Sequence, residues 1–146
     1  EFLASLVREH DGSVVKTIGD AVMAAFADPA DGLRCAIAIQ TELDAFNREH
    51  EAMPVAIKVG VHAGPTIAVT MNDRFDYFGG TVNMAARLQN ESEAGEIVLS
   101  QTMLDDPGVA KFLDDQELTE DTKEIRGFGD LVTFWRLTAP FPVVGK

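Results

Sequence analysis

Two short β-prone runs, residues 13–18 and 21–26, are separated only by Gly19 and Asp20. This spacing predicts a tight antiparallel hairpin, in which Gly19 is free to take a positive φ. A carboxylate at such a turn can project from the edge of the sheet, where a hard cation could reach it. The alternative is that Asp20 is only a favourable turn residue.

The remainder of the chain alternates between helical and extended patterns, with hairpins among them. The predicted elements are, in order, the end of a helix over 1–10, the hairpin over 13–26, a helix over 28–48 with Asp28 as its cap, a long strand over 53–61 that continues over 67–70 after a bend, a polar loop over 71–77, a helix over 81–90, a strand over 96–100, a short helix and irregular chain over 104–122, and a strand over 131–137. This order predicts an α+β fold with a largely antiparallel sheet.

The length of 146 residues is that of one domain. We expect this domain to span residues 1–138, and residues 139–146, with two prolines, to form a tail that resembles a linker. Acidic residues outnumber basic ones 24 to 12, and the net charge is -12. This charge argues against binding to nucleic acids or anionic membranes, which need a basic face. A triphosphate site in this chain must therefore be locally basic or recruit divalent cations.

Cys35 is the only cysteine, so no intramolecular disulfide can form and a cytoplasmic location is expected. It is expected to lie in the core. No apolar run approaches the roughly 20 residues of a membrane span, and no signal peptide is expected from the opening residues. The chain begins with Glu1 rather than Met, which indicates that residues upstream were removed or never sequenced.

Four further side chains could carry chemistry. Lys16 lies inside an apolar strand, where an ammonium group needs a partner or a ligand, although a lysine at a strand edge also reaches water easily. Asn83 and Arg87 share one helix face at positions i and i+4, and a guanidinium there can clamp phosphate oxygens. The alternative is a solvated helix face. Asp76 has aromatic neighbours, and is either a rim residue or an acceptor for a ligand amine.

Other familiar sites are not indicated by the sequence. His10, His50 and His62 lack the spacing of zinc ligands. No Gly-x-Ser-x-Gly nucleophile motif occurs, and no glycine-rich phosphate loop precedes a Lys-Ser or Lys-Thr pair.

Three stretches together resemble the class III adenylate and guanylate cyclases. Residues 16–26 resemble the Lys-Thr-x-Gly-Asp hairpin of that family, and residues 57–65 its strand ending in Gly-x-His-x-Gly. Residues 75–87 resemble its Tyr-Asp-x-x-Gly-x-x-Val-Asn-x-Ala-x-Arg motif, and weaker agreement occurs over 95–100 and 125–129. The resemblance covers Lys16 to about Leu137, and it is nearest to the bacterial adenylate cyclases that act as homodimers.

The resemblance implies a ferredoxin-like βαββαβ core, dimerised head to tail, with two ATP sites across the interface. Asp20 would be one of two aspartates that hold two Mg²⁺ or Mn²⁺ ions. Lys16 would donate to an adenine ring nitrogen, and Asp76 would accept from the 6-amino group. Asn83 would orient the ribose, and Arg87 would stabilise charge on the α-phosphate. Asp20 would come from one subunit and the other groups from its partner.

The implied activity is conversion of ATP to cyclic AMP and pyrophosphate, by attack of the ribose 3′-oxygen on the α-phosphorus. Guanine presents the reverse donor and acceptor pattern, which would leave Lys16 and Asp76 unpaired at about 1 to 3 kcal/mol each. This favours adenylate over guanylate cyclase activity. The two metal ions also explain how an acidic chain can receive a triphosphate.

The sequence departs from the family pattern at two informative places. The other metal-binding aspartate of the family lies in a strand before the first helix, so this chain is expected to lack that strand and to be inactive alone. Arg126 stands where the family has a second phosphate-binding lysine.

The main hypothesis is that this chain is the adenylate cyclase domain of a longer protein, which also carries regulatory domains and binds ATP as a homodimer. Two alternatives remain open. One is a non-catalytic cyclase-like module that dimerises or senses a nucleotide. The other is an unrelated ferredoxin-like domain that binds a peptide or metabolite.

Overall fold

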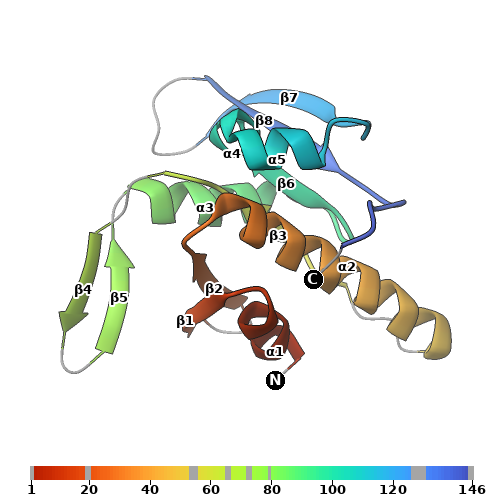
Figure 1. The fold of residues 1–146 in the computed structure, drawn as a ribbon, viewed down its shortest axis with the longest axis horizontal. Helices are drawn as coiled ribbons and strands as arrows, with labels where there is room; N and C mark the ends of the chain where they lie inside the picture. Colours follow the sequence, from red (N-terminus) through yellow and green to blue (C-terminus); the bar gives the residue numbers. More distant parts are fainter. Residues whose placement is uncertain are drawn as a thin grey trace.

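The computed structural model describes residues 2–18, 21–52, 56–64, 67–71, 74–78, 80–125 and 131–144 (Figure 1). For residues 18, 67–71, 74–78, 80 and 82 it describes the backbone only. The helices are α1 (Phe2–Glu9), α2 (Pro29–Glu49), α3 (Gly80–Glu91), α4 (Gln101–Asp105) and α5 (Pro107–Phe112). The strands are β1 (Gly12–Ile18), β2 (Ala21–Phe26), β3 (Val59–Val61), β4 (Ile67–Met71), β5 (Arg74–Phe78), β6 (Ile97–Ser100), β7 (Thr119–Glu124) and β8 (Leu131–Leu137).

A four-stranded sheet in the order β3-β6-β8-β7 forms the centre of the described structure. β3 and β6 are parallel, whereas β8 is antiparallel to both β6 and β7. All four residues of β6 are buried because helices cover both faces of this strand. Ile97 and Leu99 pack with Leu33 and Ile37 of α2, and Val98 packs on the opposite face with Leu88 of α3.

The β1–β2 hairpin forms a separate antiparallel pair, which packs beside α1 and α2. Leu6, Val7, Cys35 and Ile39 are buried in this second cluster, so the prediction that Cys35 lies in the core is confirmed. Burial, with a smaller contribution from the charge of Glu9, raises the pKa of the Cys35 thiol to about 11. The thiol is therefore protonated and unreactive at neutral pH.

The helix predicted over 28–48 is confirmed as α2, and its start has the expected chemistry. The Asp28 side chain accepts a hydrogen bond from the backbone N–H of Ala30 at 3.1 Å, and Pro29 follows at the first helical position. None of the helices in the described ranges is long and apolar enough to cross a membrane.

The predicted α+β class is confirmed, but several local predictions differ from the structure. Within the predicted strand over 53–61, residues 56–58 belong to no strand, and β3 is only three residues long. Residues 67–71 do not continue β3, and the predicted loop over 71–77 contains β5, which pairs with β4 as a separate hairpin. Residues 53–55 and 72–73 lie outside the described residues.

The irregular segment predicted within 104–122 also contains a strand, β7, at the edge of the main sheet. Its residues are mostly charged and exposed, which hides the strand from a hydrophobic pattern. Charged side chains on an edge strand oppose pairing with another chain. In the tail, Phe141 and Val144 pack against the α2 side of the core, and the domain boundary at residue 138 stays a prediction.

Candidate functional site

A β-bulge determines which way Lys16 faces. In the hairpin register Val14 pairs with Ala24, but Lys16 pairs with Met23, so Val15 is an extra residue in β1. In a regular strand Lys16 would lie on the same face as Val14, because side chains alternate. The bulge moves Lys16 to the opposite face, which it shares with Met23.

That face is directed away from the helical core. Ala24 and Phe26 of the other face pack against the cluster formed by α1 and α2. Lys16 is half-buried on the side of the hairpin that does not pack on these helices. Backbone geometry thus places Lys16 on the hairpin face opposite to that of Ala24 and Phe26.

The helix α3 presents the second group of candidate residues. Asn83 and Arg87 are exposed on one face, whereas Leu88 is fully buried and packs with Val98 and Phe134. The prediction that Asn83 and Arg87 share a face is confirmed. Within the described part of the chain the Arg87 guanidinium makes no hydrogen bond or ion pair, so it is available to a ligand.

The tertiary structure brings the elements that carry these residues together. β1, which carries Lys16, contacts β5, which carries Asp76, and α3 contacts both β3 and β5. Asp76 is opposite Val69 in the β4–β5 register. In Figure 1 this hairpin extends beyond the end of α3 at the left of the molecule. Asp20 and Arg126 lie outside the described residues.

Two glycines, Gly60 in β3 and Gly64 shortly after it, allow α3 to pack directly against this part of the chain. A Cβ atom on Gly60 would lie 2.3 Å from the backbone nitrogen of Gln89, and one on Gly64 would lie 2.8 Å from Oγ1 of Thr81. Both distances are below normal contact. The two glycines, four residues apart, therefore seat opposite ends of the same helix.

His62 lies between these glycines and is held by α4. The Thr102 hydroxyl donates to the carbonyl oxygen of Ala63 at 2.6 Å, and its oxygen lies 3.3 Å from Nδ1 of His62. The single hydroxyl proton of Thr102 is donated to the Ala63 carbonyl, so Thr102 can only accept from His62, and Nδ1 of His62 carries the donated proton. Burial lowers the pKa of His62 from 6.5.

This lowered pKa predicts a pH-dependent contribution to stability. Below about pH 6.5 the His62 side chain becomes protonated in the unfolded chain, whereas in the folded chain its lowered pKa keeps it neutral. Unfolding therefore takes up a proton, and stability falls as the pH decreases. His62→Asn should reduce the loss of Tm measured between about pH 7.5 and 5.5. An equal loss of Tm in wild type and His62→Asn would contradict this prediction.

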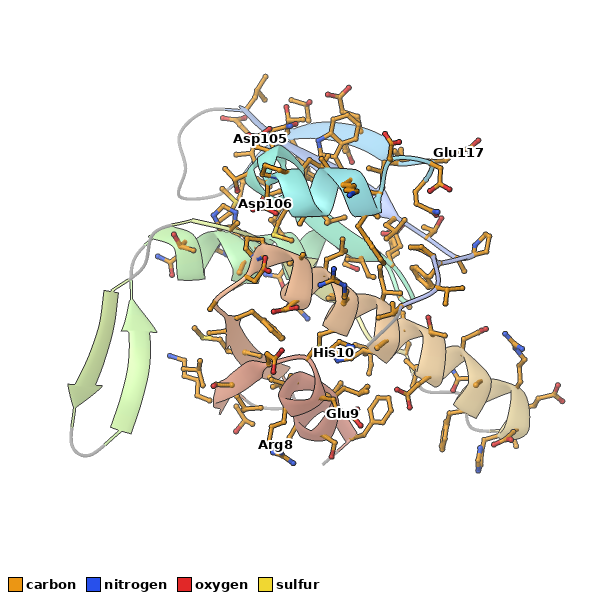
Figure 2. All side chains as sticks on the ribbon, viewed as in Figure 1. Arg8, Glu9, His10, Asp105, Asp106 and Glu117 are labelled. Atoms are coloured by element: carbon orange, nitrogen blue, oxygen red, sulfur yellow. The ribbon has the colours of Figure 1, made fainter. Side chains whose placement is uncertain are left out.

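The possible metal site rests on Asp20, whose carboxylate suits Mg²⁺ or Mn²⁺. Across the ranges that the structure describes, no group of three or more His, Cys, Asp or Glu residues could hold a metal ion. In Figure 2 the labelled acids lie in three separate places, with Glu9 at the end of α1, Asp105 and Asp106 together at the α4–α5 junction, and Glu117 beyond α5. Asp106 caps α5 by accepting from the N–H of Val109 at 3.1 Å.

A polar network at the C-terminal end of α3 was missed by sequence reasoning. The Glu91 carboxylate accepts from Nζ of Lys123 at 2.8 Å, and the Glu91 carbonyl accepts from Nη1 of Arg136 at 2.9 Å. Arg136 also donates to Glu96 at 2.7 Å and to Asp121 at 3.2 Å. The partners are 15 to 45 positions apart in the chain, so no local spacing could have indicated them.

Comparison with known proteins shows consistent similarity. Residues 1–137 match the family described as the adenylate and guanylate cyclase catalytic domain. Retinal guanylyl cyclase 2 of Bos taurus is 34% identical over an alignment of 166 residues, which covers 97% of this chain. The alignment covers 15% of that relative, so this chain spans only a small part of its length.

Two solved structures have a similar fold. The guanylyl cyclase Cya2 has a TM-score of 0.81 at 18% identity, covering 98% of this chain and 79% of that chain. The adenylyl cyclase CyaB from P. aeruginosa has a TM-score of 0.79 at 21% identity, covering 99% of this chain and 80% of that chain. The similar proteins therefore include some that are named guanylyl cyclases and one that is named an adenylyl cyclase.

Proposed function

Because this chain belongs to the adenylate and guanylate cyclase catalytic domain family, we propose that it is the catalytic domain of an adenylate cyclase. It converts ATP to 3′,5′-cyclic AMP and pyrophosphate, as part of a homodimer. The observation that supports the choice of ATP is the bulge that places Lys16 on the outer face of β1, because β1 contacts β5, the strand to which Asp76 belongs.

Lys16 and Asp76 form a donor and acceptor pair that matches adenine. The ammonium group donates to a ring nitrogen, and the carboxylate accepts from the 6-amino group. Guanine has a carbonyl oxygen and a ring N–H at the corresponding edge, so neither protein group would find its partner. An unpaired group in a desolvated site costs about 1 to 3 kcal/mol, which is about fivefold to 150-fold in kcat/KM.

Asn83 and Arg87 act on the sugar and phosphate. Asn83 orients the ribose so that its 3′-oxygen is in line with the α-phosphorus, and Arg87 stabilises the charge that develops on the α-phosphate. Arg126 contributes a second guanidinium to the triphosphate. Asp20 of the partner subunit would hold Mg²⁺ or Mn²⁺, which would offset the negative charge of the triphosphate.

The decisive experiment compares ATP and GTP as substrates of the full-length protein in the presence of Mn²⁺. We expect cyclic AMP to form with the larger kcat/KM. Formation of cyclic GMP in excess over cyclic AMP at equal substrate concentrations would assign guanylate cyclase activity, which the guanylyl cyclases among the similar proteins also favour. Nucleotide binding to a dimer without either product would indicate the non-catalytic module.

Lys16→Met tests the adenine contact directly. Removing the ammonium group should lower kcat/KM for ATP by about tenfold to 100-fold and narrow the preference for ATP over GTP. Initial rates with both nucleotides measure this change. Lys58→Met, which replaces an exposed lysine before β3, is the matched control. An unchanged ratio of the two kcat/KM values in Lys16→Met would contradict the assignment.

A further inference from the structure

Glu91 is the natural helical partner of Arg87. The two residues are four positions apart on α3, which places them about 6 Å apart along the helix axis and on adjacent turns. Oppositely charged side chains at this spacing normally attract each other. A bond between Glu91 and Arg87 would take the guanidinium from a phosphate ligand.

The structure shows Glu91 bound elsewhere. Its carboxylate accepts a hydrogen bond from Lys123 of β7 at 2.8 Å, in an ion pair whose Glu91 side chain is only 21% exposed. The same contact is the main cause that raises the pKa of Lys123. The Glu91 carboxylate is therefore paired with Lys123 of β7, and within the described residues it makes no ion pair with Arg87.

The backbone around Glu91 is also fixed. Arg136 of β8 donates to the Glu91 carbonyl and is held by Glu96 and Asp121, with only 20% of its side chain exposed. These bonds raise the pKa of Arg136 despite the opposing effect of burial, so the guanidinium stays charged. The last turn of α3 is thus anchored to β8, while Lys123 determines where the Glu91 carboxylate lies.

We propose that Lys123 is a positioning residue for catalysis: by binding Glu91 it prevents that carboxylate from pairing with Arg87, and it keeps the Arg87 guanidinium available to the substrate phosphate. The inference rests on the proposed role of Arg87. Lys123 itself does not touch the substrate. Its effect therefore falls on kcat and depends on the presence of the Glu91 charge.

The test compares four variants of the full-length protein by steady-state kinetics with ATP. Lys123→Met should lower kcat about two- to threefold, the size expected from one competing helical ion pair. Lys123→Arg keeps the bond and should retain kcat. Glu91→Gln in the Lys123→Met background removes the competing charge and should restore kcat. Lys111→Met, an exposed lysine on α5, is the control and should resemble wild type.

Salt concentration gives a second readout. The loss of kcat in Lys123→Met, relative to wild type, should shrink at high salt because screening weakens the exposed ion pair between Glu91 and Arg87. A loss that Glu91→Gln does not restore would overturn the inference, because it would indicate a purely structural role for Lys123. Unchanged kcat in Lys123→Met would also overturn it, provided that Arg87→Ala is impaired. If Arg87→Ala is itself fully active, the proposed function of Arg87 fails instead.

Discussion

Replacing Arg87 with alanine is expected to lower kcat for cyclic AMP formation by about 10²- to 10³-fold, the usual effect of removing one donor that stabilises charge in a transition state. The loss should fall on kcat more than on KM, because charge on the α-phosphate oxygens increases during the reaction. Initial rates over a range of ATP concentrations separate the two parameters.

Folding should be unaffected by this substitution. Arg87 is exposed, and within the described residues it makes no ion pair whose loss would destabilise α3. Arg48→Ala, on the exposed end of α2, removes the same charge away from α3 and should keep wild-type kinetics. Arg87→Lys keeps the charge but loses the planar fork, and an intermediate kcat is expected. Wild-type kcat in Arg87→Ala would refute the assigned role.

Gly60→Ala is expected to have the largest effect on stability, with a loss of about 3 kcal/mol in the free energy of unfolding. The added Cβ would lie 2.3 Å from the nitrogen and 2.8 Å from the Cα of Gln89, both atoms of the α3 backbone. A side chain could relieve this overlap by rotating, but a helix backbone cannot. Either α3 or β3 must therefore be displaced as a whole. Urea denaturation of the 146-residue chain measures the change.

The matched control for this prediction is Gly32→Ala in α2. Its added Cβ would lie 3.4 Å from the Phe26 ring, an ordinary contact, and alanine favours a helix interior by up to about 1 kcal/mol over glycine. We therefore expect neutral or slightly increased stability. Equal stability of Gly60→Ala and wild type would show that the packing of α3 on β3 does not require glycine at position 60.

Local chemistry explains which elements could be predicted. The cap at Asp28, the proline after it and the apolar spacing that follows predict α2 because each acts over a few residues. The β1–β2 hairpin was equally predictable, since only two residues join its strands. The shared face of Asn83 and Arg87 required nothing beyond helical spacing.

The strands that were missed have a common physical explanation. β5 is only five residues long and follows the polar residues Asn72 and Asp73, so its short alternation resembles part of a polar loop, and β7 consists of polar and charged residues without any alternation. Their extended form depends on pairing with a neighbouring strand. A pairing partner is a property of the whole fold, which a local pattern does not contain.

The sequence alone determined the α+β class and the boundaries of α2, and it supplied the candidate residues of the proposed site. Only the tertiary structure decided that Val15 bulges and turns Lys16 away from the core, and that Glu91 bonds to Lys123 instead of lying free beside Arg87. Short-range spacing fixes which residues share a helix or a turn. The direction in which a side chain points, and the partner it meets, depend on strand register and on contacts between segments 30 or more residues apart, as the 32-residue separation of Glu91 and Lys123 illustrates.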